Sequence, residues 1–333
     1  MATMIPEKRN LGNKCDILGV GAAANNRYVV SLVSLDVLNR EKSVRWIAVA
    51  FLSLFSLTAH ADQPEPGAIG FQPAATEIME RVTNFHNILL VIIALIVAVV
   101  LALLIFVIVR FNAKTNKVPS KFSHNTMVEI VWTLVPVLIL MFIAFFSFQE
   151  LYYQSVFPDV DESEVVNVKA EGNQWNWTYY YMDAVDEDGA ELSFVSNPLH
   201  RGLSGEPAGT YEAPRNLAVD YPMVVPVDTV VRVYTGATDV IHSWAVPSFG
   251  VKTDAIPGKL NELWFRVKET GTYYGQCSEL CGKDHAFMPI EVHVVTRAEY
   301  DAWLERARES VDDARQYLAS VSGNSATQLA SAR

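Results

Sequence analysis

The chain has 333 residues, half of them hydrophobic, and a formal net charge of -11 from 26 basic and 37 acidic residues. Its positive mean hydropathy favours a membrane protein over a wholly soluble one. The acidic balance argues against a nucleic-acid partner and fits a partner with a basic face. The three cysteines, Cys15, Cys277 and Cys281, are too few for a domain stapled by disulfides.

A secretory signal peptide is predicted within residues 1–61. Basic residues precede the apolar run 46–57, which is followed by an A-x-A cleavage motif. The run is too short to cross a bilayer, and the pattern is typical of a signal that is removed. Cleavage after Ala61 would remove Cys15 and leave residues 62–87 as a periplasmic N-terminal segment. A misassigned start codon is one explanation for the unusual residues upstream of the signal.

Two later apolar runs are long enough to span a membrane. Residues 88–109 carry no charge, and residues 130–148 are interrupted only by Pro136. As a helix, the first run would extend roughly 33 Å, about the thickness of the hydrocarbon layer. The intervening "RFNAKTNKVPSKFSH" has four basic residues and no acidic one, which predicts a cytoplasmic loop. We expect a transmembrane hairpin over 88–150 in a bacterial inner membrane, with the C-terminal domain in the periplasm.

Residues 151–297 predict an all-β domain, an antiparallel sandwich or barrel. Five β-branched or aromatic segments are separated by turns rich in Gly, Pro, Asn and Asp. The segments are "VVNVKAEG", "QWNWTYYYMD", "TVVRVYTG", "ELWFRVKE" and "IEVHVVT". Residues 298–333 have helical spacing and mixed charge before a polar end, which predicts a solvated helix followed by a flexible tail.

Soft metal ligands are concentrated in "YYGQCSELCGKDHAFMPIEV". Cys281, His285 and Met288, with the distant His242, could supply the thiolate, imidazoles and thioether of a mononuclear blue copper site. Cys277 is then surplus, and it indicates a pair of coppers that share both thiolates as bridges. A disulfide is the alternative for a C-x-x-x-C pair outside the cytoplasm, but the additional histidine and methionine favour copper.

Four motifs carry a resemblance to a known family over roughly residues 85–296. "HNTMVEIVWTLVPVLIL", "GNQWNWTYYY", "IHSWAVPSFGVKTDAIPG" and "YYGQCSELCGKDHAFMPI" match, in order and spacing, subunit II of the haem-copper cytochrome c oxidases of the aa3 type. The resemblance implies a cupredoxin-like Greek-key domain that holds a binuclear copper A centre. The implied copper ligands are His242, Cys277, the main-chain carbonyl of Glu279, Cys281, His285 and Met288.

The resemblance implies three further roles. Trp175 resembles the tryptophan that receives the electron from cytochrome c, although Asn176 stands where the family usually has tyrosine. Glu129 resembles the acid at the cytoplasmic entrance of a proton channel into the catalytic subunit. The side chain of Glu279 is expected to contact a Mg²⁺ or Mn²⁺ ion shared with subunit I, because hard carboxylate oxygen suits such cations.

The expected function is electron input to cytochrome c oxidase, with oxygen reduction and proton pumping in the complex and only electron transfer in this chain. Expected partners are subunit I with its haem, other oxidase subunits, membrane lipid and cytochrome c, with no nucleic acid. Acidic residues such as Asp183 and Asp239 fit a docking face for a basic cytochrome c. Three alternatives are a nitrous oxide reductase, a quinol oxidase subunit II and a membrane-tethered copper carrier or assembly factor.

Overall fold

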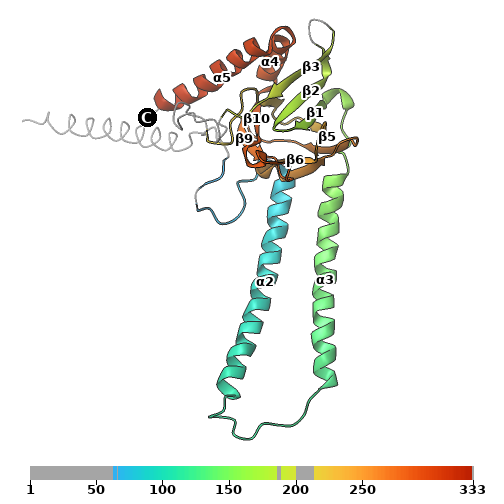
Figure 1. The fold of residues 1–333 in the computed structure, drawn as a ribbon, viewed down its shortest axis with the longest axis vertical. Helices are drawn as coiled ribbons and strands as arrows, with labels where there is room; N and C mark the ends of the chain where they lie inside the picture. Colours follow the sequence, from blue (N-terminus) through green and yellow to red (C-terminus); the bar gives the residue numbers. More distant parts are fainter. Residues whose placement is uncertain (1–62, 66, 186–188, 200–213, 332–333) are drawn as a thin grey trace, which may run out of the picture. The chain divides into compact units, whose positions relative to one another are not determined.

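A computed structural model describes residues 63–65, 67–185, 189–199 and 214–331 of the chain, with side chains as far as residue 321. The predicted signal peptide and its cleavage motif lie outside the described residues. Within these residues the chain forms two long helices, then ten strands, and then two C-terminal helices (Figure 1).

The two long helices coincide with the predicted membrane spans. Helix α2 (Glu77–Arg110) follows Thr76, and α3 (Thr126–Ser155) follows Asn125, and both preceding residues accept hydrogen bonds from amides of the first turn. The most apolar stretch of each helix is not buried against the described protein, and both helices are long and apolar enough to cross a bilayer. Apolar side chains exposed on this scale are expected where the neighbour is lipid.

Helix α2 begins at Glu77, well ahead of the predicted apolar run. Its first turn is held by the β domain: Ile78 and Met79 are only 1% and 3% exposed, and Ile78 belongs to the hydrophobic core. One turn later, Arg81 Nε donates to Glu150 Oε2 over 2.7 Å, which joins α2 to α3. The helical hairpin and the β domain are therefore connected by packing as well as by the chain.

The ten strands form three sheets. The strands are β1 Val166–Asn173, β2 Asn176–Val185, β3 Glu191–Ser196, β4 Met223–Pro226, β5 Val231–Ala237, β6 His242–Val246, β7 Val251–Ala255, β8 Asn261–Phe265, β9 Gly271–Gln276 and β10 Pro289–Val295. The larger sheet has the order β3-β2-β1-β5-β8, and the smaller sheets are β4-β10-β9 and β6-β7. The core between them contains fully buried aromatic residues, among them Trp177, Tyr179, Trp244 and Phe265.

The all-β prediction is confirmed, but the antiparallel expectation needs one correction. The pairs β1–β5 and β4–β10 run parallel, whereas the other pairs are antiparallel. Parallel neighbours need a crossover connection, and β2 to β4 supply it between β1 and β5. The five predicted segments correspond to β1, β2, β5, β8 and β10. Strands β4 and β6 are buried at every position, so they lack the alternation that marks a half-buried strand.

The C-terminal segment differs from the expected solvated helix. It forms α4 (Arg297–Glu309) and α5 (Val311–Ser331), and a capping box between Thr296 and Glu299 starts α4. Tyr300, Trp303 and Ala307 of α4 are buried. The Trp303 ring lies 5.1 Å from the ring of Tyr181 on β2. Because the apolar residues recur at helical spacing, α4 presents one stripe to the sheet and its charges to solvent.

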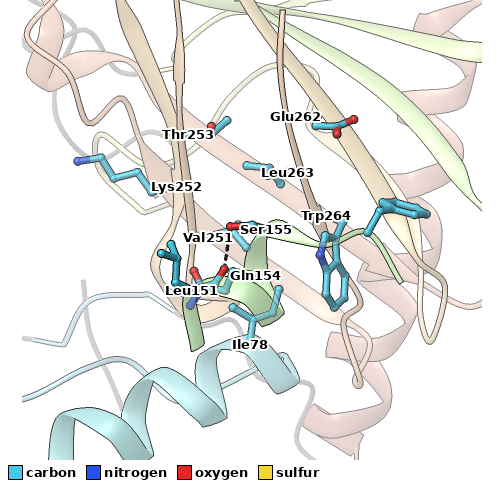
Figure 2. A pocket seen from close by; sticks show the side chains of 11 residues that line it. Ile78, Leu151, Gln154, Ser155, Val251, Lys252, Thr253, Glu262, Leu263 and Trp264 are labelled. Atoms are coloured by element: carbon cyan, nitrogen blue, oxygen red, sulfur yellow. Dashed lines mark hydrogen bonds between the residues drawn. The ribbon is translucent and has the colours of Figure 1, made fainter. Parts of the chain in front are cut away.

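A cavity of about 340 Å³ lies where the end of α3 meets β7 and β8. Figure 2 shows Leu151, Gln154 and Ser155 of α3 on one side and Lys252, Thr253, Glu262 and Trp264 of the strands on the other. None of the predicted metal ligands lines this cavity. The candidate functional site is elsewhere in the β domain.

Candidate metal centre

The predicted ligands come from two places in the β domain. His242 is the first residue of β6, and the other four candidate side chains lie in the loop that joins β9 to β10. The amide of Cys277 donates to the carbonyl of Met288 over 3.0 Å. This bond extends the β9–β10 ladder, so it closes the base of the ligand loop. A short 3-10 turn, His285–Phe287, occupies the far part of the loop.

The two sulfur atoms form the centre of the site. Cys277 Sγ lies 3.8 Å from Cys281 Sγ, and both cysteines are buried and free of a disulfide. Each sulfur also faces one imidazole: Cys277 Sγ is 3.9 Å from His242 Nδ1, and Cys281 Sγ is 3.6 Å from His285 Nδ1. The Glu279 carbonyl oxygen is 3.4 Å from Cys277 Sγ. The ligand atoms of His242, Cys277 and Cys281 all lie within 4.8 Å of one another.

The protein around His242 fixes the orientation of its ring. The residue is fully buried, and the ring of Trp177 lies 6.0 Å away in an edge-on arrangement. His242 Nε2 contacts Asp239 Oδ1 over 2.9 Å. When Nε2 carries the proton toward this carboxylate, the lone pair of Nδ1 is directed at the sulfurs. A carboxylate behind a histidine is the usual support of a metal-binding imidazole.

The two thiols titrate differently. Burial raises the pKa of the Cys277 thiol, but hydrogen bonding to His242 and to the loop backbone outweighs burial and brings the pKa to about 7. Burial and the neighbouring Cys277 sulfur raise the pKa of the Cys281 thiol to about 12. The Cys277 thiol therefore loses its proton before the Cys281 thiol does. A metal ion bound to both sulfurs would displace the remaining proton.

The donor set fits a soft transition metal. Two thiolates and two imidazoles suit copper or zinc. Met288, whose thioether is a ligand typical of copper sites, is fully buried next to the base of the loop. The Glu279 side chain is exposed, away from the buried sulfurs, and its carboxylate is a hard oxygen donor.

Most of the described chain matches one family. The family model for the periplasmic domain of cytochrome c oxidase subunit II matches residues 166–295, and the model for its transmembrane domain matches residues 64–150. The chain belongs to the cytochrome c oxidase subunit II family. Membership confirms the recognition made from the sequence motifs. It makes the chain a subunit of an oxidase that is anchored by two membrane helices and carries a C-terminal β domain.

Individual members of the subunit II family are similar along most of their length. The probable cytochrome c oxidase subunit 2 of Rickettsia bellii (strain RML369-C) is 44% identical over 78% of this chain and 91% of its own. Cytochrome c oxidase subunit 2 of Cereibacter sphaeroides is 45% identical over 74% and 82%. A crystal structure of the subunit II periplasmic domain of Bradyrhizobium japonicum has 47% identity, covers 46% of this chain and 97% of its own, and has a TM-score of 0.38.

Trp175 lies directly beside the ligand loop of this subunit II chain. Its side chain is half-buried, and its indole Nε1 donates to the carbonyl oxygen of Cys281 over 3.3 Å. The neighbouring Gln174 Nε2 donates to the same oxygen over 2.8 Å. Gly282 has a φ of 127°, and a Cβ there would approach Gln174 and Trp175 to 3.0 Å. Glycine is thus required where the turn between β1 and β2 meets the loop.

The structure does not bring the two predicted docking acids together. Asp239 lies at the site, where it contacts His242. Asp183 lies near the end of β2, eight residues beyond Trp175 and therefore roughly 26 Å away along the strand. There it accepts hydrogen bonds from the amide and the side chain of Asn167. The sequence pattern does not indicate that Gln174 supports the ligand loop, because Cys281 is 107 residues away in the chain. Asp239 stands only three residues before His242, but its predicted role is that of a docking charge.

Glu129 is remote from the metal centre. It lies in the first turn of α3 and is half-buried. Twenty-six residues of helix separate it from Ser155, which corresponds to roughly 39 Å at 1.5 Å per residue. Glu129 therefore lies at the end of α3 that is farthest from the β domain.

Proposed function

We propose that this chain is the electron-input subunit of its oxidase and that its β domain holds a binuclear copper centre. The observation that carries the proposal is the pair of buried, unlinked thiols 3.8 Å apart, each facing an imidazole nitrogen within 3.9 Å. One copper ion would need only one of these thiolates, so the second supports two ions that share both sulfurs. The proposed ligands are His242, Cys277, the carbonyl of Glu279, Cys281, His285 and Met288.

Bound copper would supply a one-electron carrier in which the unpaired electron is shared by two ions. The chain contributes a rigid frame for it. His242 has no exposed surface, and the ligand loop is closed by the bond from Cys277 N to Met288 O. A frame of this kind limits how far the ligands move when the electron arrives, which favours fast transfer.

Trp175 is proposed as the residue through which the electron arrives from reduced cytochrome c. Its indole is partly accessible, and it donates directly to the carbonyl of Cys281. This contact supports an electron-transfer route from the protein surface through the Trp175 ring and one hydrogen bond to Cys281. From the copper centre the electron would pass to the haem in subunit I, where oxygen is reduced and protons are pumped.

The finer membrane assignments complete the proposal. The basic loop between α2 and α3 supports a cytoplasmic position for that loop, so the β domain would lie in the periplasm of a bacterial inner membrane. Cleavage of the signal within residues 1–61 would agree with that orientation. Glu129 would then stand at the cytoplasmic entrance of a proton channel. The exposed carboxylate of Glu279 would bind Mg²⁺ or Mn²⁺ at the boundary with subunit I.

The test is a copper count with electron paramagnetic resonance on the purified full chain in detergent, reconstituted with copper. We expect two copper ions per chain and a hyperfine pattern from two equivalent nuclei. A single copper with a one-nucleus pattern would contradict the binuclear centre. An absence of copper together with a Cys277–Cys281 disulfide would instead favour a copper carrier or a structural subunit.

A further inference from the structure

The carboxylate of Asp239 has three hydrogen-bond partners within the protein. Oδ1 contacts His242 Nε2 over 2.9 Å and accepts the amide proton of Val240 over 2.6 Å. Oδ2 accepts the amide proton of Gln174 over 2.8 Å. Both oxygens are therefore directed into the protein. The Asp239 side chain is 32% exposed, and its partner His242 has no exposed surface.

These bonds connect the two halves of the site. The Gln174 backbone N–H donates to the Asp239 carboxylate, and the Gln174 side chain donates to the Cys281 carbonyl. Trp175 donates to the same carbonyl. A chain of hydrogen bonds thus runs from the His242 imidazole through Asp239 and Gln174 to Cys281. Its members come from the segment before β6, the turn between β1 and β2, and the loop between β9 and β10.

We propose that Asp239 is a positioning residue that fixes the His242 imidazole and the Gln174–Trp175 turn in one hydrogen-bonded frame. The inference deepens the proposed function, because it rests on His242 being a metal ligand and Trp175 the electron acceptor. This positioning role adds to the expected role of Asp239 as a docking charge, because a hydrogen-bonded carboxylate that is 32% exposed keeps its negative charge.

The frame has two physical consequences. A carboxylate that accepts the Nε2 proton keeps Nδ1 free for the metal and makes the imidazole a stronger donor. A stronger donor stabilises the oxidised, more positive form of a metal centre. Weakening the contact should therefore raise the midpoint potential of the centre. Loss of such a partner typically lowers metal affinity about 10- to 100-fold.

The experiment uses the purified oxidase complex with Asp239→Asn, Asp239→Glu or Asp183→Asn in this chain. The readouts are copper content after chelator competition, the midpoint potential of the copper signal, and the salt dependence of KM for reduced cytochrome c. Asp239→Glu is the informative variant because it keeps the charge but, being one methylene longer, changes the contact geometry. Asp183→Asn removes an exposed carboxylate that also accepts two hydrogen bonds, but it is remote from His242.

We expect both Asp239 variants to bind copper about 10- to 100-fold more weakly, and Asp239→Asn to raise the potential. Asp183→Asn should leave both copper properties unchanged. The proposal is overturned if Asp239→Glu matches the parent in every readout while Asp239→Asn changes only KM and its salt dependence, because that is the behaviour of a docking charge. The copper content of the parent complex is measured before any variant is compared. If the parent complex lacks a copper pair, the proposed function is wrong. The subunit content of each complex distinguishes weakened copper binding from loss of this chain. If the Asp239→Asn complex does not assemble, the copper affinity of the Asp239→Glu complex decides whether the proposal stands.

Discussion

Behind the His242 ring, β1 passes so closely that a Cβ at Gly172 would lie 2.8 Å from the ring carbons. On β9, a Cβ at Gly275 would collide with the carbonyl oxygen of Ala245 on β6. Neither glycine has a positive φ, so both are needed for the close approach of backbones rather than for an unusual turn. These two positions let β6 pack between β1 and β9 and bring His242 to the loop of the two cysteines.

Cys277→Ser should abolish the copper pair and leave one copper or none. Serine keeps the size of the residue but replaces the soft thiolate with a hydroxyl, which is a poor copper ligand. Copper content and the paramagnetic resonance pattern measure the change. The matched control is Ser278→Ala in the same loop, which removes only a hydroxyl that donates to the Gln276 carbonyl. Two coupled coppers in the Cys277→Ser chain would refute the bridging role.

Trp175→Ala should slow the oxidation of cytochrome c while copper content stays normal. The substitution removes both the ring and the indole N–H that donates to Cys281 O. Trp175→Phe keeps a smaller aromatic ring and loses the N–H, so we expect an intermediate rate. Stopped-flow reduction of the copper centre by cytochrome c measures both. Equal rates in all three proteins would remove Trp175 from the route.

Helix α4 contributes residues to the hydrophobic core but none to the candidate metal centre. Its polar face holds exposed pairs such as Arg297–Asp301 and Arg308–Glu305. Its apolar face places Trp303 against aromatic rings of β2 and β3. Exposed ion pairs contribute little to stability, so the buried tryptophan determines whether α4 stays on the sheet.

Trp303→Ala should destabilise the β domain by about 3–5 kcal/mol, the usual cost of truncating a buried large aromatic residue. Trp303 is 3% exposed and contacts the rings of Tyr181 and Phe194. Thermal unfolding of the purified chain in detergent measures the loss as a lower Tm. Glu305→Ala on the same helix removes only an exposed ion pair and should stay within about 1 kcal/mol of the parent. Similar Tm values for the two variants would mean that α4 is not part of the cooperative unit.

For the molecule as a whole, the hairpin would separate the two proposed kinds of chemistry. Ile78 of α2 is buried in the core of the β domain. At the other end, the first turn of α3 carries Glu129, and the linking loop is basic. A helix of 30 residues is long enough to place its two ends on opposite sides of a bilayer. The proposed electron input at one end and the proposed proton uptake at the other are therefore compatible in one chain.

Glu129→Gln should lower the turnover of the assembled oxidase without changing copper content or the rate of copper reduction. The amide cannot exchange a proton at the proposed channel entrance. Glu129→Asp keeps a carboxyl group and should retain more of the turnover. Oxygen consumption by the purified complex, with copper reduction measured in parallel, distinguishes the two ends of the molecule. Normal turnover in the Gln variant would exclude Glu129 from proton uptake.

Features that depend on local spacing could be predicted from the sequence alone. Uniform apolar runs predict the two membrane helices, and alternating segments predict five of the strands. The C-x-x-x-C-x-x-x-H motif predicts the ligand loop. Each of these patterns lies within a short, continuous segment of the sequence. Strands β4 and β6 escape prediction because they are buried on both faces. The docking of α4 escapes because its apolar stripe has meaning only against a sheet.

The assembly of the site depends on contacts between distant parts of the fold. His242 reaches the sulfurs from 35 residues away in the chain, and Gln174 reaches Cys281 from 107 residues away. From the sequence, Asp239 is expected to be a solvated charge, whereas in the fold both of its oxygens accept hydrogen bonds from the protein. Contacts between distant segments depend on how the sheets close on one another, and no local pattern encodes that closure. For this reason the candidate ligand loop could be proposed from the sequence, whereas the contact of Gln174 with Cys281 could not.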